Sequence, residues 1–581
     1  MKPLALILAV PLLAPLKAFT VGPPETNRAE HPERSGVQVE SSSVSTTASI
    51  RWAEGNMVQL AGEAARRRGI QKQYLWRYQA GSLRDNEGFV DFERDLLAPY
   101  LVRLSAKEVK ERILCAYTAV GKTLEASVVY ADTDHDAALA AVNNRYFKAL
   151  VGSQDENGYF GILKYDQEPP LFSGWILHDA AYINLAALEH HRRFGAPESL
   201  RLARRFTDLA IRSWPRAPQA PGACSPIGLS EAACQLYLAT KDPAYLRFFA
   251  DTAFDGRFID KESVREWRQA LYPPRAKAGA KTRGKVHTYR FFARCLDQLR
   301  LNELQPSPEL EVMSDYALAK MLSIEAPGMF ITGATGRREG WVEDQNGCGR
   351  IGEACAVTHQ VWWLAKLLEQ RHDLSYGDLM ERMILNHLYA AQNADPADGR
   401  SRYFTAVSGP RSFNKNAHCC EGNTRRFWAH LPELVYLTSR DTFAVNLFIP
   451  STLKATISNT LIELVQKTDY PREGEIHFTL TPQQPVEFTL QLRLPRWATA
   501  HTVAVNGAPA RPAITKGAIS LRRTWRPGDS VTLSLPMSYR WIAGHGFYQG
   551  RAALMRGPQV FCVSRTHNPA LNSISLDRIT L

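Results

Sequence analysis

The sequence lacks a hydrophobic run long enough to cross a membrane. Its longest apolar stretch, from Leu4 to Leu16, is short and interrupted by prolines, whereas a membrane-spanning helix needs about 20 apolar residues. The stretch follows Met1-Lys2 and ends close to Ala18. A basic start, a short apolar core and a small residue at the end are typical of a secretory signal peptide. We therefore expect export to the periplasm or the medium and no membrane span in the mature protein.

The sequence also lacks a concentration of charge. Its net charge is +12, but the lysines and arginines form no single run and no nucleic-acid-binding motif is present. This pattern is typical of a solvated basic surface, so we expect no nucleic-acid partner. A second interpretation is electrostatic attraction to an acidic polysaccharide such as pectin, or to an anionic cell envelope.

Cysteine is sparse, and its placement is unusual. Nine cysteines in 581 residues are too few for the dense disulfide framework of a small secreted domain. The length and an apolar content of 45% instead allow large cores in two or three domains. Two of the nine, Cys419 and Cys420, are adjacent. A vicinal disulfide, a purely structural zinc site and chance adjacency of buried cysteines all remain open for this pair.

A carboxylate and a third thiol precede the pair in Gly352-Glu353-Ala354-Cys355. Three sulfurs and one carboxylate form a donor set typical of zinc, because soft thiolates select this metal and four donors complete its tetrahedron. Four protein ligands leave no open position for an activated water. Any chemistry at such a site therefore requires a thiolate nucleophile, which the metal keeps anionic at neutral pH. We predict a Zn2+ site formed by Glu353, Cys355, Cys419 and Cys420.

These motifs resemble glycoside hydrolase family 127, the β-L-arabinofuranosidase family, in which a zinc-bound cysteine attacks the sugar. The resemblance covers roughly residues 143 to 562. Beyond the Glu-x-Cys and Cys-Cys motifs, it is carried by the segments Arg338-Glu339-Gly340-Trp341, Glu343-Asp344-Gln345-Asn346-Gly347, Leu431-Pro432-Glu433, Val445-Asn446-Leu447-Phe448-Ile449-Pro450 and Arg556-Gly557-Pro558.

The resemblance implies which residues perform the chemistry. Cys419 matches the nucleophile of the family. Glycoside cleavage also needs an acid that protonates the leaving oxygen and, in a retaining mechanism, later activates water. Glu339 matches this acid/base residue, with Glu343-Asp344 as rival carboxylates or simply a solvated acidic loop. After the cysteine pair, Glu421-Gly422-Asn423 replaces the Pro-Pro-Asn of the best-known members, so the substrate class follows less directly than the mechanism.

Three further residues match or approach sugar-contacting positions of the family. Glu381 falls where the family has a sugar-binding glutamate, and His287 and His178 fall at plausible histidine positions. For each histidine the alternative is a core or surface residue without function. Near Pro226, where the family has another histidine, this sequence has none.

The apolar spacing divides the chain into a helical and a β-rich part. From about residue 53 to residue 430, apolar residues recur at helical spacing, as in Leu202, Phe206 and Leu209. Lys241-Asp242-Pro243 predicts a helix start, with a capping aspartate before a proline in the first turn. After about residue 441 the spacing changes to two, as in Phe488-Leu494, which indicates strands.

We therefore predict an α+β multidomain protein. Its parts are a signal peptide over residues 1–18, a serine-rich disordered linker over residues 19–53, an (α/α)6 barrel catalytic domain over residues 54–438 and a β-sandwich region over residues 439–581. The barrel and the sandwich are implied by the resemblance. Spacing alone indicates a large helical region followed by strands.

The predicted function is a zinc-dependent retaining exo-glycosidase. It would hydrolyse terminal β-L-arabinofuranosides or related pectic sugars of a plant-type or pectic oligosaccharide. The alternative from another class is a non-catalytic carbohydrate-binding protein whose zinc stabilises the barrel. A polysaccharide lyase or uronyl hydrolase is a third possibility, but such enzymes need no cluster of cysteines and zinc.

Overall fold

A computed structural model describes residues 50–79, 89–112, 119–173, 176–217, 227–253, 287–323, 328–341, 349–409, 411, 413, 418–545, 548–564 and 568–569. The predicted signal peptide and the linker up to residue 49 lie outside the described residues. Across the described part of the chain, every helix is too short or too polar to cross a bilayer.

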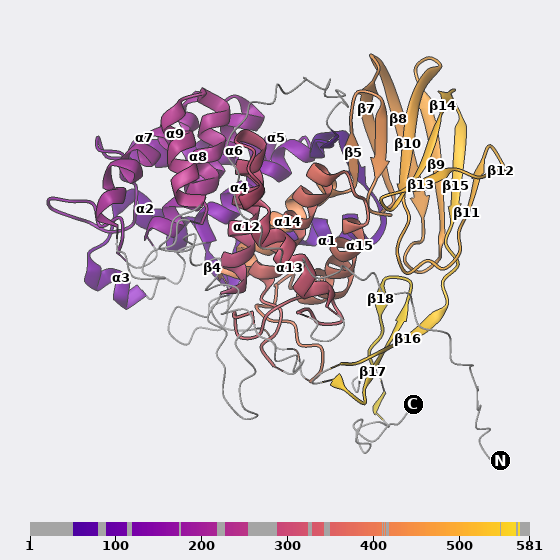
Figure 1. Cartoon of the computed structure of the whole chain (residues 1–581). Helices are drawn as coiled ribbons and strands as arrows, with labels where there is room; N and C mark the ends of the chain where they lie inside the picture. Colours follow the sequence, from indigo (N-terminus) through magenta and orange to yellow (C-terminus); the bar gives the residue numbers. More distant parts are fainter. Residues whose placement is uncertain are drawn as a thin grey trace, which may run out of the picture. The chain divides into compact units, whose positions relative to one another are not determined.

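Helices occupy most of the described chain up to residue 430 (Figure 1). The α-helices are α1 (Gly62–Gln73), α2 (Ala98–Val102), α3 (Ala106–Arg112), α4 (Ala119–Thr133), α5 (Ala137–Ser153), α6 (Ile176–Phe194), α7 (Pro197–Ser213), α8 (Leu229–Thr240), α9 (Pro243–Ala253), α12 (Thr288–Leu304), α13 (Val312–Leu322), α14 (Ala354–Arg371), α15 (Tyr376–Met383), α16 (Tyr389–Ala391) and α17 (His418–His430). Two π-helical segments, η2 (Phe92–Leu97) and η5 (Ile384–Leu388), and four 3-10 turns, η1 (Gly55–Met57), η3 (Trp214–Arg216), η4 (Pro308–Leu310) and η6 (Leu431–Leu434), complete the set.

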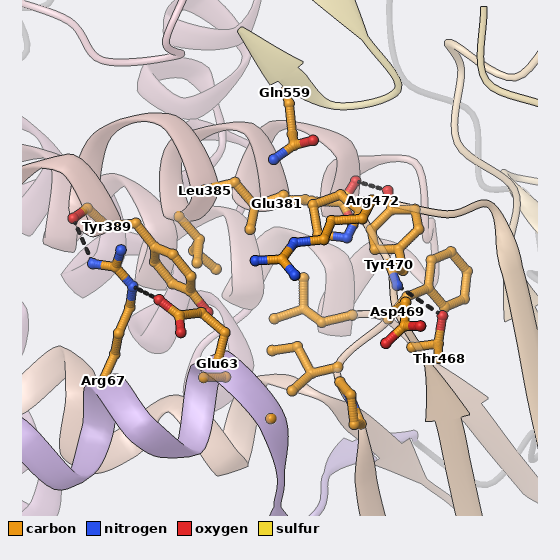
Figure 2. A pocket seen from close by; sticks show the side chains of 18 of the residues that line it. Glu63, Arg67, Glu381, Leu385, Tyr389, Thr468, Asp469, Tyr470, Arg472 and Gln559 are labelled. Atoms are coloured by element: carbon orange, nitrogen blue, oxygen red, sulfur yellow. Dashed lines mark hydrogen bonds and ion pairs between the residues drawn. The ribbon is translucent and has the colours of Figure 1, made fainter. Parts of the chain in front are cut away.

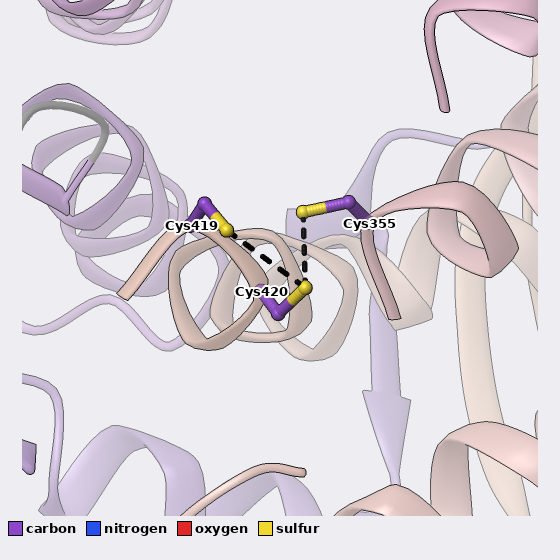
Figure 3. Close-up of side chains that lie close together, drawn as sticks. All are labelled: Cys355, Cys419 and Cys420. Atoms are coloured by element: carbon purple, nitrogen blue, oxygen red, sulfur yellow. Dashed lines mark hydrogen bonds between the residues drawn. The ribbon is translucent and has the colours of Figure 1, made fainter. Parts of the chain in front are cut away.

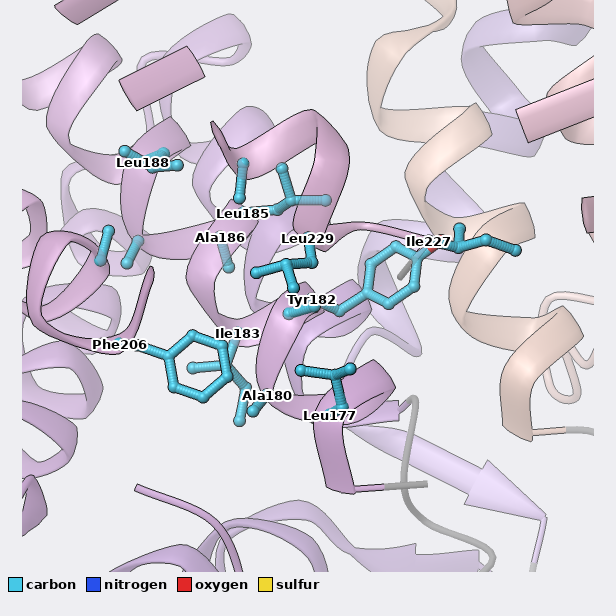
Figure 4. Close-up of a cluster of buried hydrophobic side chains, with 14 of the residues drawn as sticks. Leu177, Ala180, Tyr182, Ile183, Leu185, Ala186, Leu188, Phe206, Ile227 and Leu229 are labelled. Atoms are coloured by element: carbon cyan, nitrogen blue, oxygen red, sulfur yellow. The ribbon is translucent and has the colours of Figure 1, made fainter. Parts of the chain in front are cut away.

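The helices fall into two kinds according to how many of their faces are buried. Helix α6 buries every residue from Ile176 to His190, and Figure 4 shows its apolar side chains packed among those of neighbouring helices. Helix α7 instead buries one stripe that includes Leu202, Phe206 and Leu209, as the sequence predicts. A helix that is buried all round lies inside a helical domain, whereas a one-sided helix lies on its outside.

Helix α4 lies directly on α6 at Gly121. A Cβ atom at this position would lie 2.2 Å from the backbone carbon of Tyr182 and 2.3 Å from the backbone nitrogen of Ile183. Only glycine therefore fits at this contact. The same helix α4 packs against α17, which brings α4 close to the cysteine pair.

Helix α9 begins as predicted. Pro243 is its first residue, and the Asp242 carboxylate accepts a hydrogen bond of 2.9 Å from the backbone N–H of Ala244. Such a cap satisfies one of the N–H groups that have no partner within the helix.

Strands dominate the described chain after residue 435. They are β5 (Tyr436–Thr438), β6 (Thr442–Val445), β7 (Ser451–Ile457), β8 (Thr460–Thr468), β9 (Glu475–Pro482), β10 (Val486–Arg493), β11 (Thr502–Val505), β12 (Ala508–Ala510), β13 (Ala513–Thr515), β14 (Ala518–Trp525), β15 (Asp529–Ser534), β16 (Tyr539–Ala543), β17 (Ala552–Arg556) and β18 (Gln559–Val560). The strands of the earlier part are β1 (Arg51–Trp52), β2 (Val58–Leu60), β3 (Arg77–Gln79) and β4 (Phe89–Asp91).

Two of the sheets share one hydrophobic core. The first has the order β1-β5-β6-β10-β14-β13 and the second the order β12-β11-β15-β9-β8-β7-β2. Alternate residues of β10, including Phe488 and Leu490, point into the core, where they meet Leu464 and Phe478 of the second sheet. Alternation with one face buried is the pattern of a sandwich. A smaller sheet, β16-β17-β18, follows.

Residues at the start of the described chain complete both large sheets. Arg51 of β1 pairs with Thr438 of β5, and Val58 of β2 pairs with Leu453 of β7, both antiparallel. The sequence analysis placed these residues at the end of the linker and the start of the helical region. The pairing joins segments far apart in the chain, so no local spacing in the sequence indicates it.

A buried arginine joins the sandwich to the helices. Arg493 of β10 is completely buried, and its guanidinium forms ion pairs with Asp378 and, at 2.6 Å, with Glu381, both in α15. Gly377 makes room for it, since a Cβ atom there would lie 2.6 Å from Cδ of Arg493.

Candidate active site

The three predicted thiols converge at the beginnings of two helices. Cys355 lies in the first turn of α14, and Cys419 and Cys420 lie in the first turn of α17. Their sulfurs all lie within 4.8 Å of one another. Sγ of Cys420 is 3.3 Å from Sγ of Cys355 and 4.0 Å from Sγ of Cys419 (Figure 3). A helix N-terminus stabilises negative charge, so both helices favour thiolates at this point.

The adjacent cysteines form no disulfide in this structure. All three thiols are free, and the 4.0 Å between Sγ of Cys419 and Sγ of Cys420 is about twice the length of a sulfur–sulfur bond, about 2.05 Å. Of the three, Cys355 and Cys420 are buried and Cys419 is partly exposed. Cys419 is therefore the thiol that a ligand can reach most directly.

Glu353 adds a carboxylate to the three sulfurs. Its Oε1 lies 3.9 Å from Sγ of Cys420, its Oε2 has no hydrogen-bond partner among the described residues, and the residue is only 3% exposed. Tetrahedral zinc with zinc–sulfur bonds of about 2.3 Å places its sulfurs about 3.8 Å apart, between the two sulfur–sulfur distances above. The donor types and the sulfur–sulfur distances fit a metal such as zinc. Cys355, Cys419 and Cys420 would hold it, and Glu353, beside Cys420, is the predicted fourth ligand.

The surroundings shift the pKa values of the three thiols in different directions. Burial raises the pKa of Cys355 and of Cys420 well above the usual value for a thiol, because a charge is costly away from water. Hydrogen bonds from Cys355 and Cys420 lower the pKa of Cys419 well below its usual value. Cys419 is therefore the thiol whose anionic form the site favours most.

The predicted acid/base residue sits in a strained turn. Arg338 and Glu339 have φ angles of 49° and 69°, a left-handed conformation that is costly for residues other than glycine. Backbone hydrogen bonds hold the turn, from Gly340 N–H to the Arg337 carbonyl at 3.1 Å and from Thr288 N–H to the Glu339 carbonyl at 2.8 Å. Strain of this kind gathers at functional sites, where surrounding contacts maintain it.

His287 lies between the two carboxylates of the site. Its Nε2 is 3.7 Å from Oε2 of Glu339, and its Nδ1 is 3.8 Å from Oε2 of Glu353. Burial lowers the pKa of His287, while the charge of Glu339 opposes this effect. The structure thus brings Glu339 and His287 to the same group as the thiols.

Tyr403 is a member of this group that the sequence analysis did not identify. Its hydroxyl donates a 2.5 Å hydrogen bond to Oε1 of Glu339, and its hydrogen bond to Cys419 contributes to the lowered pKa of that thiol. The Tyr403 carbonyl accepts a hydrogen bond of 2.9 Å from the N–H of Ala354, which places the tyrosine at the start of α14. No motif marks this residue, because its position depends on a contact between distant segments.

His178 also lies near the thiols, within α6. Its ring meets Tyr182 and Tyr289 edge-on, with centroids 5.0 Å and 6.3 Å away. Burial lowers the pKa of His178 well below its usual value, while the charge of Cys419 acts in the opposite direction. His178 is thus close enough to the nucleophile candidate for their charges to interact.

Glu381 is placed differently from the other predicted site residues. One carboxylate oxygen pairs with Arg493, and the other accepts a hydrogen bond of 2.7 Å from the hydroxyl of Tyr470. Both oxygens are therefore occupied by contacts that join α15 to the sheets. The contacts of Glu381 among the described residues include none with the thiols.

A cavity of about 800 Å³ lies beside Glu381 and does not include the thiols. It is lined by residues of α1, of the α15 to α16 segment and of the turn around Tyr470, among them Arg67, Tyr389 and Arg472 (Figure 2). Of the predicted site residues, Glu381 alone is among its lining residues.

Several residues named in the sequence analysis lie outside the described residues. These are Glu343 and Asp344, the rivals of Glu339, and Pro226. Three of the nine cysteines, Cys115, Cys224 and Cys348, also lie outside the described residues. The other cysteines are free thiols: Cys234 and Cys295 are buried, and Cys562 is exposed.

Comparisons with known families match most of the chain. Residues 101–433 match the model of the β-L-arabinofuranosidase catalytic domain of glycoside hydrolase family 127, and residues 442–537 match the middle domain of the same family. A non-reducing end β-L-arabinofuranosidase of Bifidobacterium longum subsp. longum is 26% identical over 274 residues, which cover 42% of this chain and 40% of that protein. The match thus spans about two fifths of the relative's length.

Solved structures share the fold. The crystal structure of a family 127 β-L-arabinofuranosidase from Geobacillus stearothermophilus T6 has a TM-score of 0.69 at 21% identity, covering 88% of this chain and 86% of the other. A second family 127 β-arabinofuranosidase also has a TM-score of 0.69, at 18% identity, covering 89% of this chain and 86% of the other.

Proposed function

Because the chain belongs to glycoside hydrolase family 127, the β-L-arabinofuranosidase family, we propose that it is an exported, zinc-dependent retaining exo-glycosidase. Its substrate is a terminal β-L-arabinofuranoside or a related pectic sugar on a plant-type oligosaccharide. One observation carries the proposal. Three free thiols and a buried carboxylate converge at two helix starts, next to Glu339 and its partners Tyr403 and His287.

In the proposed reaction, Sγ of Cys419 attacks the anomeric carbon while Glu339 gives its proton to the glycosidic oxygen. The carbon–oxygen bond breaks, and a carbon–sulfur bond forms. Glu339 then takes a proton from water, whose oxygen attacks the same carbon and releases the Cys419 thiolate. Two displacements at one carbon retain its configuration. Bound zinc would keep its thiolate ligands deprotonated at neutral pH.

The neighbours of Glu339 have separate roles in this proposal. Tyr403 holds Oε1 of Glu339 at 2.5 Å and so orients the carboxyl group toward the leaving oxygen. His287 and His178 are the sugar-contact candidates that lie near Cys419, whereas Glu381 is engaged by Arg493. We assign sugar binding to the two histidines first.

We also infer that the helices form an (α/α)6 barrel. The burial of α6 and of the first half of α14 on all sides supports an inner ring, and the one-sided burial of α7 supports an outer ring. The thiols then lie where two inner helices begin.

Paired variants test the mechanism. The parent should hydrolyse aryl β-L-arabinofuranosides and lose activity when a chelator removes zinc. Cys419→Ser should lose nearly all turnover, because a serine hydroxyl is not ionised at neutral pH.

Glu339→Gln should be slow on ordinary glycosides but partly active on substrates with a good leaving group, because such a leaving group needs less protonation. Cys562→Ser, which changes an exposed thiol outside the site, is the matched control and should keep parental activity.

The same assay distinguishes the alternative function. If the parent binds arabinose-containing oligosaccharides but hydrolyses no arabinofuranoside or pectic glycoside, the protein is a carbohydrate-binding protein and the proposed enzymatic function is wrong. A zinc-free parent with a Cys419–Cys420 disulfide, detected by mass spectrometry, would remove the basis of the mechanism.

A further inference from the structure

Lys122 is a buried lysine that points at the thiol site. It lies in α4 and is 0% exposed. Its Nζ donates a 3.4 Å hydrogen bond to the backbone carbonyl of Cys419 and lies over the ring of Tyr182, 4.4 Å from the centroid, and over that of Tyr289, at 5.5 Å. Lysine is almost never fully buried unless a partner compensates its charge.

Lys122 forms no close ion pair among the residues that the structure describes, because none of them has a carboxylate oxygen within 4.0 Å of its Nζ. The neighbouring buried cation, Arg426, does have such a partner, because Oε1 of Glu125 lies 2.7 Å from its guanidinium. The positive charge of Lys122 therefore has the thiol site as its anionic counterpart.

Two glycines allow the lysine to reach this position. Gly121 lets α4 lie against α6, which places Tyr182 beneath the ammonium group. Gly422, in α17, faces the lysine stem, since a Cβ atom there would lie 2.9 Å from Cβ and 3.1 Å from Cδ of Lys122. A side chain at position 422 would push the lysine away from Cys419.

We propose that Lys122 is a positioning residue of the thiol site, whose ammonium offsets the excess negative charge of the buried ligands and holds the Cys419 backbone. The inference rests on the proposed zinc–thiolate site. Three thiolates and a carboxylate carry more negative charge than a divalent ion neutralises, and Glu353, Cys355 and Cys420 are buried from water. A nearby cation stabilises such a group of buried anions, because water screens the attraction between buried charges only weakly.

The effect of Lys122 on its neighbours agrees with this role. Burial raises the pKa of Glu353 and of Cys355 well above their usual values, and the charge of Lys122 opposes the rise in both groups. Hydrogen bonds from the other two thiols lower the pKa of Cys419, and the charge of Lys122 lowers it further.

The test separates charge from packing through zinc affinity, measured by competition with a chelator. Lys122→Met keeps the unbranched stem as far as Cε and removes the charged terminal nitrogen, so it should weaken zinc binding about 10- to 100-fold, as changes to residues that support metal ligands do. Lys122→Arg keeps the charge and should recover most of the affinity. Lys320→Met is the matched control, because Lys320 is a second buried lysine, lying over the ring of Trp341, and its loss should leave zinc affinity unchanged.

A second readout uses the metal-free protein and cobalt. Thermal unfolding without metal should show Lys122→Met to be no less stable than the parent, because a buried charge without its anionic partner favours unfolding. Bound Co2+ should show weaker sulfur-to-cobalt absorption in Lys122→Met at matched metal concentration. Lys122→Gln provides another uncharged side chain if Lys122→Met does not fold.

The outcomes are distinct from those for the proposed function. Parental zinc affinity in Lys122→Met and Lys122→Gln would overturn the inference, and so would a Lys122→Arg variant as weak as the uncharged ones. A parent that binds no zinc would overturn the proposed site itself, and this inference with it.

Discussion

Gly352 shapes the chain just before Glu353 and Cys355, two of the predicted zinc ligands. Its φ of 57° lies in the left-handed region, and a Cβ atom there would lie 2.2 Å from the ring of His387. Nε2 of that histidine is 2.8 Å from the Gly352 carbonyl oxygen. Glycine thus lets the chain turn sharply and admits an imidazole that fixes the backbone just before the ligands.

Removing the carboxylate ligand should lower both zinc content and stability. We expect Glu353→Ala to weaken zinc binding more than about 100-fold, beyond the range for residues that merely support a ligand. Zinc binding contributes to folding free energy, so the melting temperature should fall toward that of the chelator-treated parent. Elemental analysis and thermal unfolding with and without chelator measure both effects. Unchanged zinc content would show that Glu353 is not a ligand.

At the scale of elements, α15 and β10 are joined by charge rather than by apolar packing alone. Arg493 is fully buried between Asp378 and Glu381, and it also donates a 2.5 Å hydrogen bond from Nε to the carbonyl of Asn446. Tyr470 satisfies the remaining oxygen of Glu381. Arg493 is thus the cation that pairs with both carboxylates of α15 at this contact.

We expect Arg493→Met to destabilise the protein by about 3–5 kcal/mol, because it leaves the buried carboxylate of Glu381 and the partly buried carboxylate of Asp378 without their cation. Chemical denaturation measures the change in unfolding free energy. The control is Arg522→Met, which removes an arginine of β14 whose side chain is 57% exposed and whose ion pairs with Asp441 and Glu487 lie at the surface. That variant should change stability little. Equal effects of the two substitutions would contradict a structural role for the buried pair.

Across the whole helical part, a buried network of charges connects α4, α6, α17 and η6. Nδ1 of His430 lies 2.6 Å from Oε2 of Glu433, and its Nε2 lies 3.6 Å from Oε1 of Glu125. Burial would lower the pKa of His430, but the charge of Glu433 and the hydrogen bonds that the ring donates to both carboxylates prevail and raise it to about 9. Arg193 and Arg426 pair with the same two carboxylates, Glu433 and Glu125 respectively.

This network predicts a loss of stability in mild alkali. The pKa of His430 is higher in the folded protein than the usual value of about 6.5, so its contribution is complete below pH 6.5 and is lost as the pH rises through 9. The loss should be on the order of 2–3 kcal/mol. Denaturant unfolding at pH 6 and pH 9.5 measures it, and His430→Gln should flatten the dependence. A parent equally stable at both values would contradict the shifted pKa.

Features that depend on neighbouring residues could be predicted from the sequence. Helical spacing placed α7, an aspartate before a proline placed the start of α9, and alternation placed β10, because periodicity and capping are local. The Glu-x-Cys and Cys-Cys motifs predicted which thiols would meet, because donor chemistry limits the partners of a cysteine pair.

Features that depend on contacts between distant segments could not be predicted in this way. Tyr403 reaches Glu339, and Lys122 reaches Cys419, through helices and turns that no spacing connects. Glu381 matched a sugar-binding position in sequence, yet its carboxylate meets Arg493 of a strand more than a hundred residues later. A buried charge is compensated by whichever partner the fold brings close to it. The number of residues between the two in the sequence is not fixed, so spacing cannot predict the pair.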